Sequence, residues 1–121
     1  MDTSPRSSEL PPASPADLVW HDVASYLDLP TDGSGITVEF GKRPVAVFRI
    51  GDELFAVHDT CPHASASLGM GIVVDGEVAC PWHSFHFDLR TGRNTDGLAC
   101  RVKVHPIRRT GEGRVEVGLP H

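Results

Sequence analysis

Hydrophobic and polar positions along this chain follow the two-residue period of strands more often than the 3.6-residue period of helices. Short apolar segments, rich in β-branched and aromatic side chains, recur between turn sequences. One stretch, residues 22–29, has room for a helical turn. Short strands at this spacing predict an all-β sandwich or barrel. The expected strand segments are 18–23, 36–40, 44–50, 53–59, 71–80, 85–89, 100–108 and 114–119.

One turn can be predicted in detail. Asp75 and Gly76 separate two valine-rich runs within residues 71–80. An Asp-Gly pair favours the type I′ turn, in which both central residues have positive φ. We therefore expect a tight two-residue hairpin here.

The first residues differ in composition from the rest of the chain. Residues 1–16 contain four prolines and four serines and almost no large apolar side chain. Such a segment cannot bury enough apolar surface to fold, so it is predicted to be a disordered tail. Residues 17–121 are expected to form one domain.

Composition and charge narrow the classes of function. The chain has 121 residues and a formal net charge of -5, which disfavours a nucleic-acid binder, because phosphate binding requires a basic face. The first residues show no basic segment followed by an apolar one, and no apolar run approaches the ~20 residues of a membrane span. The expected location is the cytoplasm, with no membrane partner.

Cysteine and histidine occur together twice, at residues 61–63 and 80–83. The pattern is Cys61-x-His63, sixteen residues, then Cys80-x-x-His83, and a proline follows each cysteine. The chain has three cysteines, and an odd count argues against a disulfide framework. Each pair follows an apolar strand segment, so two stiff loops on neighbouring strands could direct these four side chains at one metal centre.

Two metal centres fit these ligand types, because thiolate and imidazole together bind zinc or iron. Structural zinc sites usually take two ligands from each loop, with two to four residues between paired cysteines. Here a single residue separates Cys61 from His63, which fits that pattern poorly. The repeated Cys/His pair suits a two-iron cluster better than a single ion, since both cysteines can bind one iron and both histidines the other. A zinc-stabilised interaction module remains the alternative.

The motif resembles that of the Rieske [2Fe-2S] family, C-x-H-x(15–17)-C-x-x-H. The segments "CPHASASLGMG" and "CPWHSFHFDLRTG" are similar to the two family loops, and "VKVHPIR" is similar to the family's C-terminal strand pair. The resemblance covers about residues 17–119. It implies stacked antiparallel sheets with a small cluster-binding subdomain and one [2Fe-2S] cluster. It also implies that Cys61 and Cys80 bind the inner iron, and His63 and His83 the outer iron.

The resemblance also indicates in which part of the Rieske range the reduction potential of this chain should lie. High-potential Rieske proteins have a disulfide between the two loops, whereas this chain has Ala66 and Trp82 at the matching positions. Phe85 and Phe87 stand where those proteins have hydroxyl groups that donate to the cluster. Fewer hydrogen bonds stabilise the reduced cluster less, so we expect a potential at the low end of the Rieske range.

The family resemblance implies an electron carrier without bond-making chemistry of its own. Its partners would be a reductase and a larger oxidoreductase subunit. The segments quoted above favour the small subunit of an NAD(P)H-dependent nitrite reductase. The alternative is the ferredoxin component of an aromatic-ring dioxygenase.

Overall fold

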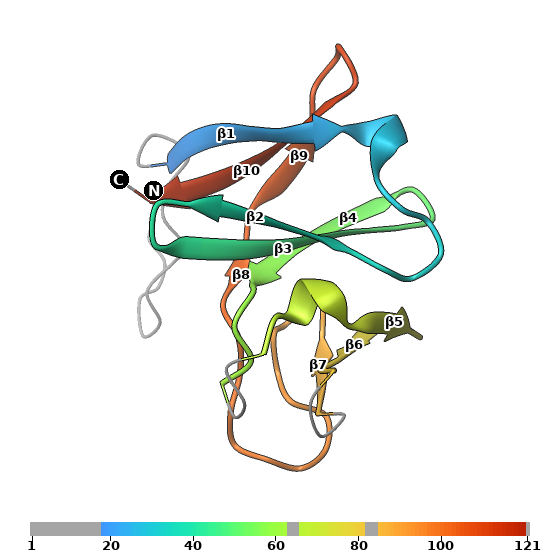
Figure 1. Ribbon diagram of the computed structural model, residues 1–121, viewed down its shortest axis with the longest axis vertical. Helices are drawn as coiled ribbons and strands as arrows, with labels where there is room; N and C mark the ends of the chain where they lie inside the picture. Colours follow the sequence, from blue (N-terminus) through green and yellow to red (C-terminus); the bar gives the residue numbers. More distant parts are fainter. Residues whose placement is uncertain (1–17, 63–65, 82–84, 121) are drawn as a thin grey trace, which may run out of the picture.

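The computed structural model describes residues 18–62, 66–81 and 85–120. Three antiparallel sheets stack along the long axis of the molecule (Figure 1), so the all-β class expected from the sequence is confirmed. Over the described ranges no helix is long and apolar enough to cross a membrane. The tail predicted for residues 1–16 lies outside these ranges and remains a prediction.

The outer sheet joins the first strand of the chain to the last. Its order is β1 (Leu18–Ser25), β10 (Arg114–Pro120) and β9 (Ile107–Arg109). Strand β1 is longer than the apolar segment 18–23 suggested, because pairing with β10 continues as far as Ser25. The helical turn expected within residues 22–29 follows directly as η2 (Tyr26–Asp28), a single 3-10 turn.

The middle sheet has the most continuous apolar sequence and both of its faces are covered. Its order is β2 (Ile36–Phe40), β3 (Arg43–Ile50), β4 (Glu53–His58) and β8 (Val104–His105). Residues 45–48 of β3 are all fully buried, although successive side chains point to opposite faces. A strand with neighbours on both faces needs an unbroken apolar run, which explains the "VAVF" of β3.

A small third sheet lies beyond the middle sheet, at the lower end of Figure 1. Its order is β5 (Ile72–Val74), β6 (Glu77–Ala79) and β7 (His86–Asp88). Asp75 and Gly76 connect β5 to β6 with φ of 54° and 79°. Positive φ at both central residues confirms the tight hairpin predicted from the Asp-Gly pair.

Two hydrophobic cores share the middle sheet. We call the one between the outer and middle sheets the base core, and the one between the middle and small sheets the tip core. Val45, Val47 and Ala56 point into the base core, whereas their neighbours Ala46 and Val57 point into the tip core. The base core consists of Tyr26, Leu29, Val45, Val47, Ala56, Val115, Val117 and Leu119. The tip core consists of Ala46, Phe48, Phe55, Val57, Cys61, Ala66, Leu68, Val73, Val78, Cys80, Phe87, Leu89 and Val102.

The segment expected to form one strand over residues 100–108 is two strands in different sheets. Strand β8 ends at His105 and pairs with β4, whereas β9 begins at Ile107 and pairs with β10. Pro106 lies between them, and its ring nitrogen has no hydrogen to donate to a ladder. The Pro106 carbonyl accepts a hydrogen bond from Gly118 at 2.9 Å, so the chain changes sheets at the proline.

A glycine turn connects the small sheet to the middle sheet. Gly92 follows β7 with φ of 78°, and a Cβ at this position would overlap the Val102 carbonyl oxygen. The Val102 amide donates to the Gly92 carbonyl at 2.8 Å. Only glycine allows this close approach of the two backbones, which holds the chain leading into β8 against the small sheet.

Candidate metal centre

Two cysteines begin the two loops that the sequence singled out. Cys61 lies three residues after β4 ends, and Cys80 follows β6 directly. Both are buried, with 1% of each residue exposed, and both belong to the tip core. One strand of the middle sheet and one strand of the small sheet therefore deliver the two thiols to the same core.

The two loops are closed in the same way. The Cys61 amide donates to the Ala66 carbonyl at 2.9 Å, and the Cys80 amide donates to the Phe85 carbonyl at 2.7 Å. Each hydrogen bond joins a cysteine to the residue five positions later. The flanking residues also pair, Thr60 with Ser67 and Ala79 with His86. The doubled Cys/His pattern in the sequence therefore corresponds to two loops with matching backbone closure.

The predicted histidine ligands, His63 and His83, lie outside the described residues, as do the rest of 63–65 and 82–84. Within the ranges that are described, no group of three or more His, Cys, Asp or Glu side chains gathers at one point. The structure thus brings Cys61 and Cys80 into one core and leaves the four-ligand set as a prediction.

The surroundings of the two thiols suit a sulfur-ligated metal. Leu68, Val78 and Phe87 are fully buried in the same core, and Phe85 packs against it. A thiolate in such apolar surroundings is costly unless a cation compensates its charge. Thiolates also select soft metal centres such as iron-sulfur clusters. The buried donor pair therefore fits the metal centre expected from the sequence.

The residues expected to set the potential are partly described. Ala66 is buried in the tip core, and no disulfide joins any of the three cysteines, all of which are described. Phe87 is fully buried and supplies an apolar ring where a hydroxyl would be needed for a hydrogen bond. Trp82 lies outside the described residues. These positions support the low potential expected from the sequence, which remains a prediction.

A buried carboxylate, which the sequence analysis did not single out, anchors the first loop. Asp59 is 5% exposed, and its Oδ1 accepts hydrogen bonds from Thr37 Oγ1 at 3.0 Å, Ser67 Oγ at 2.9 Å and the Gly69 amide at 2.8 Å. Its backbone carbonyl also accepts from the Leu68 amide at 2.6 Å. Asp59 therefore ties β2 and the two sides of the first loop together. The only signal in the sequence was an acidic residue between an apolar strand and the first cysteine.

We expect Asp59→Ala to lower the free energy of unfolding by about 3 kcal/mol, since three donors, among them the buried Gly69 amide, lose a shared carboxylate acceptor. Asp59→Asn keeps an acceptor oxygen and should cost about 1 kcal/mol. Urea unfolding followed by circular dichroism would measure both. Asp22→Ala is a matched control, because Asp22 makes an exposed ion pair with Arg114 and should barely change the midpoint. Equal losses for Asp59→Ala and Asp22→Ala would contradict the anchoring role.

The second loop is supported by a different acid. The His86 amide donates to Asp96 Oδ2 at 2.7 Å, and its Nδ1 lies 3.1 Å from Asp96 Oδ1. This amide hydrogen bond is the main reason that the pKa of Asp96 lies below its usual value. The His86 side chain is half-exposed, whereas the side chain of the next residue, Phe87, is buried in the tip core. Cys100 is half-buried beside the tip core, outside any strand.

Comparisons with known proteins agree on one family. The model of the Rieske [2Fe-2S] domain matches residues 19–106. The anthranilate 1,2-dioxygenase ferredoxin subunit of Burkholderia cepacia is 44% identical over 101 residues, which cover 83% of this chain and 92% of that protein.

Solved structures share the fold. One described as an NADH-dependent nitrite reductase small subunit from Mycobacterium tuberculosis has a TM-score of 0.80 at 32% identity, covering 86% of this chain and 97% of that one. Another comes from a complex of reduced oxygenase and oxidised ferredoxin in carbazole 1,9a-dioxygenase. It has a TM-score of 0.73 at 31% identity and covers 80% of this chain and 99% of that one.

Proposed function

The chain belongs to the Rieske [2Fe-2S] domain family, and from this premise we propose that it is the ferredoxin component of an aromatic-ring-hydroxylating dioxygenase system. A Rieske ferredoxin binds a [2Fe-2S] cluster and transfers electrons. In the proposed system this chain accepts one electron from a reductase and passes it to a terminal oxygenase. The proposed location is the cytoplasm, where cysteines that form no disulfide persist.

We prefer the dioxygenase ferredoxin component to the nitrite reductase small subunit, which is the reverse of the preference drawn from the sequence segments alone. Those segments favoured a nitrite reductase small subunit, whereas the 44% identical relative is a dioxygenase ferredoxin subunit matched over 92% of its length. Nitrite reductase small subunits share the fold at lower identity, as the Mycobacterium tuberculosis structure does. The family match also favours an iron-sulfur cluster over the zinc-stabilised module that the sequence left open.

The proposed ligands are Cys61 and Cys80 for the inner iron and His63 and His83 for the outer iron. Matching closure of the two loops supports this assignment, because it gives both cysteines the same backbone setting. When bound, the cluster supplies a site that gains and loses one electron. The protein contributes the dry tip core around the thiols, which excludes water, and Asp59, which holds the first loop against β2 and β3.

The two contexts can be separated by measuring electron delivery. The purified protein would be mixed with NADH, anthranilate and the reductase and oxygenase components of the Burkholderia cepacia system, and hydroxylated product would be measured. A parallel reaction would contain NADH, nitrite and the large subunit of an NADH-dependent nitrite reductase. We expect product in the first reaction and no ammonia in the second. The Burkholderia cepacia ferredoxin subunit is the positive control. Ammonia formation without hydroxylated product would overturn the proposal.

A further inference from the structure

A pocket of about 270 Å³ at one edge of the middle sheet is lined by basic side chains. Its lining residues are Arg43, His58, Lys103, His105 and Pro120. Arg43 begins β3, His58 ends β4 and Pro120 ends β10. His105 ends β8, and Lys103 directly precedes that strand. None of the described lining residues is acidic, although the whole chain has a net charge of -5. The local charge is therefore opposite in sign to that of the molecule.

His105 is a buried group with an unmet hydrogen-bonding requirement. It is 7% exposed, and neither Nδ1 nor Nε2 has a partner in the described part of the chain. Burial, together with a smaller electrostatic effect of the nearby Lys103, His58 and Arg43, lowers the pKa of His105 to about 4. At neutral pH the ring is therefore uncharged and presents one N–H donor. A buried donor without an acceptor is costly, which is why such groups are rare without a ligand or water.

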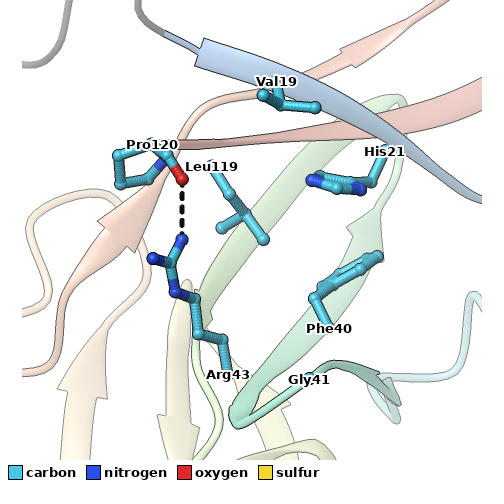
Figure 2. A pocket seen from close by; sticks show the side chains of 7 residues that line it. All are labelled: Val19, His21, Phe40, Gly41, Arg43, Leu119 and Pro120. Carbon is cyan, nitrogen blue, oxygen red and sulfur yellow. Dashed lines mark hydrogen bonds between the residues drawn. The ribbon is translucent and has the colours of Figure 1, made fainter.

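Backbone pairing and one side-chain hydrogen bond bring the basic groups together. The His58 amide donates to the Lys103 carbonyl at 2.8 Å, which places β4 beside the start of β8. Arg43 Nη1 donates to the Pro120 carbonyl oxygen at 2.8 Å, as Figure 2 shows. This hydrogen bond uses one of the five guanidinium donors and keeps Arg43 at the end of β10.

We propose that this pocket binds a small oxyanion, of the phosphate or carboxylate class. Arg43 and Lys103 supply positive charge. His105 supplies a buried N–H group that can donate a hydrogen bond to an oxygen of the anion. Guanidinium and ammonium groups are the usual partners of such anions. The volume lies below the roughly 300–1,000 Å³ of pockets for drug-sized ligands, so it suits a small anion. The pocket is separate from the two cysteine loops, and the proposal does not depend on the redox partner.

Calorimetric titration of the cluster-loaded protein at pH 7 tests the proposal, with sodium phosphate and sodium acetate as the probes. Sodium chloride at matched ionic strength controls for screening. We expect saturable 1:1 binding of phosphate or acetate and none of chloride. A bound anion should also raise the unfolding temperature as its concentration increases. Absence of saturable binding by both oxyanions would overturn the proposal.

Three variants locate the binding. Lys103→Met should weaken binding by about fivefold, the effect of one unit charge at a solvent-exposed contact. Lys42→Met is the matched control, because Lys42 is the only other lysine in the chain and does not line the pocket. It should change the affinity less than twofold. His105→Phe removes the buried donor, so it should weaken binding while keeping the fold. Equal losses in the two lysine variants, or unchanged binding in both Lys103→Met and His105→Phe, would contradict the proposed site.

Discussion

Cys80→Ser is expected to yield a colourless protein that retains less than about a tenth of the normal iron and acid-labile sulfide. Serine is a harder and less acidic donor than cysteine, and a [2Fe-2S] cluster requires thiolates on its inner iron. Cys61→Ser should have the same effect, because its loop has the same closure and its thiol is equally buried. Iron and sulfide analysis, together with visible absorption before and after dithionite, measures the loss.

Cys100→Ser is the matched control for both changes. Cys100 is half-buried beside the tip core, outside the two loops, and is not one of the proposed ligands. The Cys100→Ser protein should keep its full iron content and its colour. Far-ultraviolet circular dichroism would verify that all three variants keep their β structure. Full cluster content in Cys61→Ser or Cys80→Ser, or its loss in Cys100→Ser alone, would refute the assignment of the inner-iron ligands.

A second large effect is expected from His83→Cys, which should lower the reduction potential by about 100 mV or more. Two ferric ions, two sulfides and two thiolates sum to zero charge when the other ligands are neutral imidazoles. A third thiolate adds a negative charge and makes electron addition harder. All-cysteine plant-type clusters lie near about -400 mV, compared with about -150 to +300 mV for Rieske clusters.

Redox titration followed by electron paramagnetic resonance would report both the potential and the average g value. His86→Gln is the control, since His86 is half-exposed on β7 and contacts Asp96. Its potential should lie within about 30 mV of the unsubstituted protein, because His86 is not a proposed ligand and solvent screens electrostatic effects at its half-exposed position. A His83→Cys protein with an unchanged potential and g value would show that His83 does not bind the outer iron.

Local sequence signals predicted the strands well where both the pairing and the turn are local. The hairpin around Asp75 and Gly76 is an example, since its turn type follows from the two residues themselves. Non-local pairing set the features that the sequence did not reveal. The extension of β1 to Ser25 depends on β10, about ninety residues later, and the division at Pro106 depends on which sheet lies nearest.

The candidate site shows the same division. Residue type and spacing singled out Cys61 and Cys80, and the structure brings both into the tip core, while their role as iron ligands stays a prediction. The role of Asp59 was not predictable, since its partners Thr37 and Gly69 are 22 and 10 residues away. The basic pocket was equally hidden, because its lining residues come from four strand ends that only the fold brings together.

The shared middle sheet has a consequence for protein engineering. Alternate residues of β3 and β4 belong to the tip core and to the base core. The small sheet and the two cysteine loops therefore cannot be separated from the middle sheet without dividing the tip core. A transplanted tip would leave one side of those two strands facing solvent. The smallest unit that could be transferred to another protein is therefore the small sheet with its two loops, the middle sheet, and a layer that covers the other face of the middle sheet.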